Sequence, residues 1–475
     1  MNWLYTLIFA STFFAIAINM ANCNIGVCPS PNIILCMADD QGWGDMAYYG
    51  HPVLQTPNFD KLAASGLRFD HFYAAAPVCS PTRGSVMTGR HPNRFGCFNA
   101  GLTLRPQEIT IAEALKTAGY VTGHFGKWHL GSVQIGSPVN PGASGFDEWL
   151  SAPNYFDNDP ILSHKGVAVQ KYGESSMVVM DEAIRFIRSY AYSGQSFFAV
   201  IWFGSPHVPH EAAAQDGALY AEQETELQNY YGEITGIDRA MGKLRKELKD
   251  LEIAENTILW YCSDNGTKIG STGGRGRKGQ IYEGGLRVPA IIEWPARIKQ
   301  SRITNIPANT FDIYPTLLEI CGIKMQNQPV LDGISLVPVI DNKMNKRTKP
   351  IGFWHAADGR IIPGYKWMKE LLKVQEEGKM IIDSSMLDLD AGDISIQYPE
   401  HSFPGHAAWI DWPFKLHKIQ DGTGQIKIEL YNLVKDSMER NDLFQIDSKR
   451  VNSMLLQLEK WQESVVKSLN GKDYH

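Results

Sequence analysis

The chain has 475 residues, of which 44% are hydrophobic and 20% are charged, so it can bury one large core and a smaller one, and two domains are expected. Its formal net charge of −6 and its isoelectric point near 6.1 provide no basic field, which excludes nucleic acid as an expected partner. An anionic polymer would have to be bound by local lysines and arginines.

The first expected element is an apolar run over residues 3–18, followed by small residues near Ala21. The run is too short for a membrane-spanning helix and is typical of a signal peptide, which we expect over residues 1–22. The sequence around Cys23 also resembles a lipoprotein cleavage site, so a lipid anchor at Cys23 is the alternative and the one expected route to a membrane. The single glycosylation sequon starts at Asn265, which has another expected role. We therefore expect an exported bacterial protein, periplasmic or secreted.

Short apolar runs alternate with helical patterns over the first 350 residues, which predicts an α/β sheet with helices on both faces. Buried strands are expected at residues 32–38, 197–203, 257–263 and 288–294. Asp39 and Asp40 follow the first strand, His207 follows the second, and Asp264 with Asn265 follows the third. Because ligands bind beyond the carboxyl ends of strands in open α/β sheets, these polar residues are expected to converge on one crevice.

Apolar positions at three-and-four spacing predict helices at residues 58–64, 111–118, 176–190 and 237–251. The basic, polar stretch 342–349 indicates a boundary near residue 350, which ends a first domain at residues 23–350. Residues 351–475 are expected to form a smaller domain. Its expected elements are strands at 409–416 and 426–433 and a terminal helix at 451–469.

Asp39, Asp40, Asp264 and Asn265 offer three carboxylates and one amide oxygen from two strand ends. An all-oxygen set of this kind suits Ca²⁺ or Mg²⁺ better than zinc. Each pair alone is also typical of a turn. Together they favour a metal site, because carboxylates clustered at buried strand ends repel one another unless a cation offsets their charge.

Cys79 begins the hexapeptide Cys-Ser-Pro-Thr-Arg-Gly, in which Pro81 lies near an expected helix start and Arg83 lies four residues after the cysteine. A glycine-rich segment at residues 119–131 contains Lys127 and His129. In an extended segment these two side chains face the same side, where they could act as donors to the oxygens of an anionic ester group. A surface lysine and a structural histidine are the alternative.

His207 lies in the hexapeptide Ser-Pro-His-Val-Pro-His, and an imidazole there can donate a proton to a leaving alkoxide near neutral pH. His210, the last residue of this hexapeptide, is the rival for that role. Lys278 lies in a basic loop at residues 274–279, whose glycines let a backbone and a lysine approach an oxyanion closely. A solvated basic loop is the alternative for Lys278.

The hexapeptide at 79–84 and the segment at 119–131 resemble the two signatures of the type I sulfatases, which belong to the alkaline phosphatase superfamily. The resemblance covers nearly the whole chain, with specific motifs from residue 39 to residue 295. It implies the alkaline-phosphatase-like fold. This fold has a large mixed, mostly parallel sheet sandwiched by helices, and a smaller C-terminal α+β domain of antiparallel strands and a terminal helix.

The resemblance also implies how the nucleophile and the metal are held. A maturation enzyme encoded elsewhere would convert Cys79 to formylglycine, whose hydrated aldehyde attacks sulfate esters, and Arg83 would steady the hydrated form. The metal would be calcium, with magnesium as the alternative. Its ligands would be Asp39, Asp40, Asp264, Asn265 and the modified Cys79.

In the same family pattern, Lys127 and Lys278 would bind the sulfate group. His207 would protonate the leaving sugar oxygen and would contact the substrate. His129 would assist the elimination that expels sulfate and restores the aldehyde. Unmodified Cys79 would be nearly inert in this role.

Contacts to the sugar are expected from residues after the nucleophile, namely His91, Arg94 and Asn99, and from the loop 154–158. Aromatic, amide and carboxylate groups there suit sugar faces and hydroxyls. The segment 355–406 is longer than the family core needs, and we expect it to close over the pocket and to help select the glycan.

The expected function is hydrolysis of sulfate esters on carbohydrates by an exported enzyme of polysaccharide degradation. N-acetylgalactosamine 6-sulfate and algal glycans are both compatible substrates. A phosphodiester or phosphonate monoester hydrolase of the same superfamily is the enzymatic alternative, and a non-catalytic glycan-binding homologue is the other.

Overall fold

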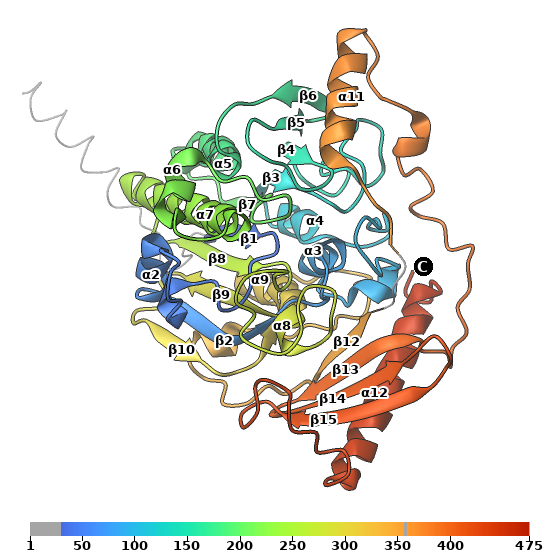
Figure 1. The fold of residues 1–475 in the computed structure, drawn as a ribbon. Helices are drawn as coiled ribbons and strands as arrows, with labels where there is room; N and C mark the ends of the chain where they lie inside the picture. Colours follow the sequence, from blue (N-terminus) through green and yellow to red (C-terminus); the bar gives the residue numbers. More distant parts are fainter. Residues whose placement is uncertain (1–29, 356–358, 475) are drawn as a thin grey trace, which may run out of the picture. The chain divides into compact units, whose positions relative to one another are not determined.

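Five parallel strands form the centre of an eleven-stranded sheet (Figure 1) in the computed structural model, which describes residues 30–355 and 359–474. Their order across the sheet is β8 (Thr257–Ser263), β1 (Asn32–Ala38), β7 (Phe197–Trp202), β3 (Val121–Lys127) and β4 (Glu148–Ala152). Apolar runs buried on both faces are what a parallel sheet requires, and β7 and β8 are buried at every position. The expected signal peptide and Cys23 lie outside the described residues.

Further strands extend this sheet on both sides. Next to β8 come β9 (Arg287–Glu293) and then β2 (Leu67–Tyr73), both in antiparallel pairings, while β10 (Arg302–Thr304) and β11 (Ala308–Asn309) pair with β2 in parallel. Beyond β4 lie the antiparallel strands β5 (Ile161–His164) and β6 (Val167–Gln170). The sheet is therefore mixed, with a parallel centre.

Side chains of β1 alternate between the two faces of the sheet, as the pleat of a strand dictates. Ile33, Leu35 and Met37 belong to one hydrophobic core, and Ile34 and Cys36 belong to the other. The first core is completed by α3 (Cys79–Thr88), α4 (Ile111–Thr117) and α9 (Ile313–Cys321). The second is completed by α2 (Pro57–Ala63), α5 (Ser175–Ala191) and α7 (Thr225–Asp250).

Several short helices connect these elements. They are α6 (Ala214–Gly217), α8 (Glu283–Leu286), α10 (Val337–Ile340), and the 3₁₀ turns η1 (Ala47–Tyr49), η2 (Pro92–Phe95), η3 (Ala218–Tyr220), η4 (Thr310–Asp312) and η5 (Ser384–Met386). Among the described residues, no helix is both long and apolar enough to cross a membrane.

A second, antiparallel sheet follows in the order β12 (Ile351–His355), β13 (Gly405–Asp411), β14 (Phe414–Gln420) and β15 (Ile426–Asn432). The long helix α12 (Ser448–Leu469) packs on it through Val451, Met454, Leu458 and Val465. Between β12 and β13 lies α11 (Gly364–Glu376), which is orange in Figure 1.

The predicted fold is confirmed: a large mixed, mostly parallel sheet with helices on both faces, and a C-terminal antiparallel sheet with a terminal helix. Residues 31–475 form one compact unit, and the expected boundary near residue 350 falls just before β12, so the division into two domains stays a prediction. Two element predictions were wrong. The run 409–416 is two strands that meet at a turn containing Trp412 and Pro413, and α7 starts at Thr225, earlier than the predicted residue 237.

Candidate active site

The carboxyl ends of four parallel strands bring the predicted polar residues to one edge of the sheet. Lys127 is the last residue of β3, and Asp39 with Asp40 follows β1. Asp264 follows β8, and its backbone amide donates to the carbonyl of Ala38 at 3.1 Å. The structure thus joins residues that are more than 200 positions apart in the sequence, as expected from the strand-end rule.

Cys79 is the first residue of α3, and only 2% of its surface is exposed. Its sulfur and one carboxylate oxygen each from Asp39 and Asp264 all lie within 4.8 Å of one another. Burial raises the pKa of the Cys79 thiol, so the unmodified side chain is a neutral and poorly nucleophilic group at neutral pH.

The oxygen-rich set predicted to hold a metal is fully buried. Asp39, Asp40, Asp264 and Asn265 are each at most 2% exposed. Two of their oxygens, Asp39 Oδ1 and Asn265 Oδ1, accept no hydrogen bond from any described residue. Buried oxygens without a donor are costly unless a cation or water satisfies them. The residues therefore fit a divalent, oxygen-preferring ion.

Three cations border these carboxylates. Lys127 Nζ lies 2.7 Å from Asp39 Oδ2, and Lys278 Nζ lies 2.6 Å from both carboxylate oxygens of Asp40. Arg83 donates from Nη2 to Asp264 Oδ2 at 2.8 Å.

The charges of the cluster set the pKa values of its acids. Burial alone would raise the pKa of Asp39, but Lys127 and its other cationic neighbours outweigh it and hold that pKa well below its usual range. Burial, with the charge of Asp39 beside it, raises the pKa of Asp264 to about 7. The raised pKa of Asp264 shows that the neighbouring cations do not fully offset the burial of this carboxylate and the charge of Asp39, and a bound cation would do so.

His207 follows β7 and lies next to Asp40, with its Nε2 atom 3.8 Å from Asp40 Oδ2. Its other ring nitrogen lies 2.6 Å from the carbonyl oxygen of Val208, which fixes Nδ1 as the donor in that contact. Tyr155 stacks on the imidazole, with ring centroids 4.5 Å apart and an angle of 16° between the planes. Burial lowers the pKa of His207 to about 4, although Asp40 and Asp39 act in the opposite direction.

His129 is buried, and its Nδ1 atom has no hydrogen-bond partner among the described residues. Burial, and then the charge of Lys127, lowers its pKa well below the usual range. The segment is not extended throughout, as the alternation argument assumed, because β3 ends at Lys127 and His129 has a φ angle of 53°. The charge of Lys127 nevertheless acts on His129, so the two side chains lie near each other.

Among the described residues, the ring and ion-pair contacts of His210 are with Tyr230 and Glu233 and not with the Cys79 cluster. Its ring lies edge-on to Tyr230 at 5.2 Å, and its Nδ1 atom is 3.5 Å from Glu233 Oε2. The structure therefore favours His207 over His210 as the histidine beside the carboxylates.

Two of the residues expected to contact the sugar are structural. Arg94 is 2% exposed, and its guanidinium binds both carboxylate oxygens of Asp332 at 2.6 and 2.9 Å, so it is not free to meet a substrate. His91 is fully buried, and its ring accepts a hydrogen bond from the backbone amide of Asn93. Asn99 is partly exposed in a loop near the start of α3, and its sugar contact stays a prediction.

Sequence reasoning missed Ser80 and Arg360. The hydroxyl of Ser80 accepts from the backbone amide of Gly101 at 2.8 Å, which holds the loop 99–101 against the start of α3. The backbone amide of Arg360 donates to the carbonyl of Ala100 at 3.0 Å. No sequence motif surrounds Arg360. Its place next to the loop 99–101, and through that loop next to α3, is visible only in the structure.

A family model described as Sulfatase matches residues 31–323. N-acetylgalactosamine-6-sulfatase of Canis lupus familiaris is 34% identical over 355 residues, and the alignment covers 65% of this chain and 66% of that protein. The ulvan-active sulfatase of Formosa agariphila is 31% identical over 335 residues, covering 66% of this chain and 65% of that protein. The chain thus aligns with just under two thirds of the length of these relatives.

A solved structure is similar to this chain over most of its length. The crystal structure of Ps i-CgsB in complex with k-i-k-neocarrahexaose superposes with a TM-score of 0.75 and 25% identity, over 93% of this chain and 97% of that one. The chain belongs to the sulfatase family, whose members are sulfuric ester hydrolases. The predicted membership of the type I sulfatases is confirmed.

Proposed function

We propose that the protein hydrolyses sulfate esters on carbohydrates, with a nucleophile formed from Cys79. The observation that carries the proposal is the position of the Cys79 sulfur, at the start of α3 and within 4.8 Å of the carboxylates of Asp39 and Asp264. No other described cysteine belongs to a group of residues that could hold a metal.

A calcium ion, or magnesium as the alternative, would be held by five residues: Asp39, Asp40, Asp264, Asn265 and the modified Cys79. A bound divalent cation lowers the pKa of a hydroxyl of hydrated formylglycine and offsets the buried negative charge. Arg83 keeps Asp264 in place through its ion pair, and it donates from Nη1 to the carbonyl of Lys127 at 3.1 Å. It thereby also fixes the end of β3.

Lys127 and Lys278 would bind the non-reacting oxygens of the sulfate. Both ammonium groups lie at the carboxylate cluster and are held by Asp39 and Asp40 respectively. Fixed cations in a site that excludes water stabilise developing negative charge more strongly than they would in water. The Lys127 side chain is fully buried and that of Lys278 is 10% exposed, which satisfies this condition.

His207 would give its proton to the leaving sugar oxygen. Its Nδ1 atom donates to Val208, so Nε2 is the nitrogen that would carry the transferable proton. Because burial lowers the pKa of His207 to about 4, Nε2 would take up this proton only when the negative charge of the sulfate lies beside it. Stacking against Tyr155 fixes the plane of the ring. His129 would assist the release of sulfate from the protein.

The substrate class follows from the relatives and is likewise a proposal. The names of the relatives describe sulfatases of N-acetylgalactosamine 6-sulfate and of ulvan, and one related structure holds a neocarrahexaose. These proteins share sulfated carbohydrate as their substrate, which supports a sulfated oligosaccharide or polysaccharide here. We further propose export to the periplasm or the medium, with membrane attachment only through a lipid at Cys23, and conversion of Cys79 by a formylglycine-generating enzyme.

The test is a screen of protein that was coexpressed with a formylglycine-generating enzyme, against defined sulfated saccharides, read by released sulfate. Mass spectrometry of the peptide containing Cys79 should show the aldehyde. Cys79→Ala should abolish turnover and keep glycan binding. Equal turnover in both proteins would overturn the proposal.

The same screen separates the two alternatives. Faster turnover of aryl phosphodiesters or phosphonates than of any sulfate ester would indicate the phosphoryl hydrolase. Binding of sulfated glycans without release of sulfate, by protein shown to carry the aldehyde, would indicate the non-catalytic homologue.

A further inference from the structure

Residues 359–364, which we call the strap, lead into α11 and lie against both sides of the candidate site. At one end the amide of Arg360 donates to the carbonyl of Ala100 at 3.0 Å. At the other end Asn154 Nδ2 donates to the carbonyl of Ile362 at 2.6 Å. The strap therefore connects two loops that are far apart in the sequence.

Each of these loops is next to a different part of the catalytic machinery. Gly101, one residue after Ala100, donates to the hydroxyl of Ser80, which adjoins Cys79. Asn154 immediately precedes Tyr155, whose ring stacks on His207. The strap thus extends from the loop beside the nucleophile to the loop beside His207.

A cleft of about 350 Å³ opens beside the strap. The residues of its wall that matter here are Phe98, Gly101, Arg105, Arg360, Asp388 and Tyr398. The rings of Phe98 and Tyr398 meet edge to face, with centroids 5.7 Å apart. Aromatic rings beside arginine and carboxylate groups are suited to the faces and hydroxyls of sugars.

The guanidinium of Arg360 is held in this wall by a single residue. Among the described residues its guanidinium donates to Asp388 Oδ1 alone, at 3.0 Å, and 42% of the side chain is exposed. Asp388 is itself buried, and its other oxygen accepts from the backbone amide of Ser132, just after the segment that carries Lys127 and His129. Arg360 is therefore positioned from the catalytic side and keeps free donors for a ligand.

We propose that this cleft is a binding subsite for the sugar units next to the one that loses sulfate, and that Arg360 binds an acidic group on them, either a sulfate ester or a carboxylate. The inference rests on the proposed function. Two exposed carboxylates, Asp390 and Asp393, also line the cleft. They would repel further acidic groups of the ligand, so the cleft suits a glycan segment with one acidic group at Arg360 and hydroxyls elsewhere.

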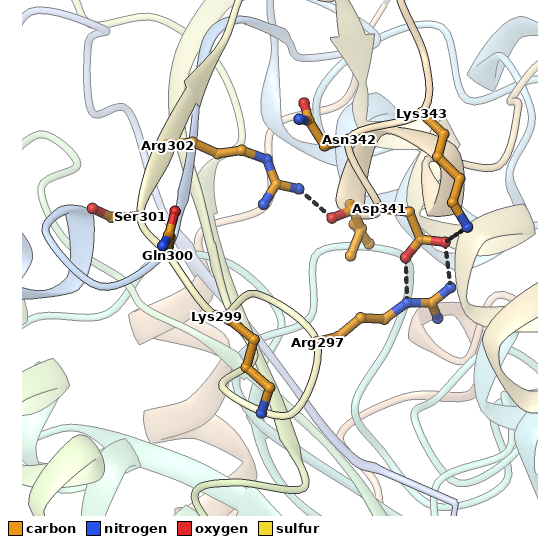
Figure 2. A pocket seen from close by; sticks show the side chains of 9 residues that line it. Arg297, Lys299, Gln300, Ser301, Arg302, Asp341, Asn342 and Lys343 are labelled. Atoms are coloured by element: carbon orange, nitrogen blue, oxygen red, sulfur yellow. Dashed lines mark hydrogen bonds and ion pairs between the residues drawn. The ribbon is translucent and has the colours of Figure 1, made fainter.

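A second charged cleft, of about 670 Å³, provides a matched control (Figure 2). In it, Arg297 binds both carboxylate oxygens of Asp341 at 2.6 and 3.0 Å, and 32% of its side chain is exposed. Arg297 comes after the end of β9, which is antiparallel to β8, so this cleft lies at the sheet edge opposite Asp264. The candidate active site around Cys79 therefore does not include Arg297.

The experiment compares matured wild type, Arg360→Met, Tyr398→Ala and the control Arg297→Met. Each is assayed on an aryl sulfate and on three forms of one sulfated tetrasaccharide: with a carboxylate on the neighbouring sugar, with a second sulfate there, and with neither. The quantity compared is kcat/KM for a tetrasaccharide divided by kcat/KM for the aryl sulfate. For the two acidic forms, Arg360→Met should lower this ratio about ten- to a hundredfold, mainly by raising KM, because one charge-assisted contact is lost.

The remaining arms separate the contributions. Which of the two acidic tetrasaccharides loses more in Arg360→Met identifies the acidic group, and the neutral form should keep its ratio. Tyr398→Ala should lower the ratio for all three tetrasaccharides, because it removes a sugar-facing ring. Arg297→Met should match wild type. Unchanged ratios in Arg360→Met, or equal losses on all four substrates, would overturn the subsite.

A binding measurement keeps the test independent of turnover. Calorimetry of the acidic tetrasaccharides with Cys79→Ala and with Cys79→Ala/Arg360→Met should give a Kd that is about tenfold weaker for the double variant. Equal Kd values would overturn the subsite even if the wild type is active. Wild-type protein that binds the tetrasaccharides but releases no sulfate from any substrate would instead overturn the proposed function.

Discussion

The ammonium of Lys127 lies 2.7 Å from Asp39 Oδ2, and neither side chain is exposed to solvent. Asp39 fixes the position of the Lys127 ammonium through this ion pair. Asp39 is also an expected ligand of the metal. The pair therefore links the sulfate-binding side of the site to the metal-binding side, and changes at either residue should affect both.

Lys127→Met should lower kcat/KM for an aryl sulfate on the order of 10²- to 10³-fold, because it removes one fixed donor to the developing charge. Steady-state kinetics of matured protein measures this. Lys116→Met is the control, since Lys116 pairs with Asp147 at the surface and both side chains are about 40% exposed. A Lys127→Met enzyme within a few fold of wild type would contradict the assigned role.

Removal of the metal should abolish turnover and lower the free energy of unfolding. A cation at 100 times its Kd contributes about 2.7 kcal/mol to stability, so chelation followed by added calcium should shift the thermal midpoint reversibly. Asn265→Ala removes a buried oxygen that lacks a hydrogen-bond donor and should reduce the shift caused by calcium. Asn452→Ala, at an exposed position of α12, should leave the shift unchanged. An equal shift in both variants would exclude Asn265 as a ligand.

The strand ends and the two signature motifs were sufficient to predict the centre of the site. Asp39 and Asp264 could be placed together because parallel strands share one edge at their carboxyl ends. The pairing of Arg94 with Asp332 could not be predicted, since the two residues are 238 positions apart and no local pattern connects them. Arg94 was therefore mistaken for a sugar contact.

Local sequence features account for the wrong strand at residues 409–416 and for the wrong backbone expectation at His129. Pro413 lies inside the run 409–416, and a proline in a predicted strand indicates an edge or a turn, as the structure has it. At His129 the backbone is left-handed, which a strand pattern does not reveal. The strap could not be placed from sequence, because its contacts to Ala100 and Asn154 are made by backbone carbonyl and amide groups.

Stability should fall as the pH rises from acid toward neutrality because of Glu233. Burial raises the pKa of this carboxyl from its ordinary value of 4.5 to about 7. The folded protein then binds a proton more tightly than the unfolded chain does, so stability decreases with pH between 4.5 and 7. Glu233→Gln cannot ionise and should exceed wild type by on the order of 2–3 kcal/mol at pH 8.

Urea unfolding of both proteins between pH 5 and pH 8 measures this difference. The gap should widen as the pH rises, and Glu222→Gln, at an exposed position, should follow wild type throughout. Parallel curves for wild type and Glu233→Gln would show that Glu233 ionises normally in the fold.

A buried ion cluster joins the second sheet to the loop of Lys278. Lys415 Nζ lies 3.0 Å from Glu283 Oε1 and 3.1 Å from Glu439 Oε1, and all three side chains are at most 1% exposed. Glu439 also accepts from the backbone amide of Glu283 at 2.7 Å. Glu283 begins α8, five residues after Lys278, so β14 and the segment containing Glu439 fix the base of the loop that supplies a sulfate-binding cation.

Lys415→Met should lower the free energy of unfolding by about 3–5 kcal/mol, because it leaves two buried carboxylates without their cation. It should also raise KM for aryl sulfate more than it lowers kcat, since Lys278 loses its fixed position while the nucleophile at the start of α3 does not depend on this cluster. Denaturant titration and kinetics on the same preparation measure both effects. Lys299→Met is the control, because Lys299 is 67% exposed in its pair with Glu255, which is itself 65% exposed, and a surface pair contributes at most about 1 kcal/mol. A destabilised Lys415→Met protein with unchanged KM would show that the cluster stabilises the fold without positioning Lys278.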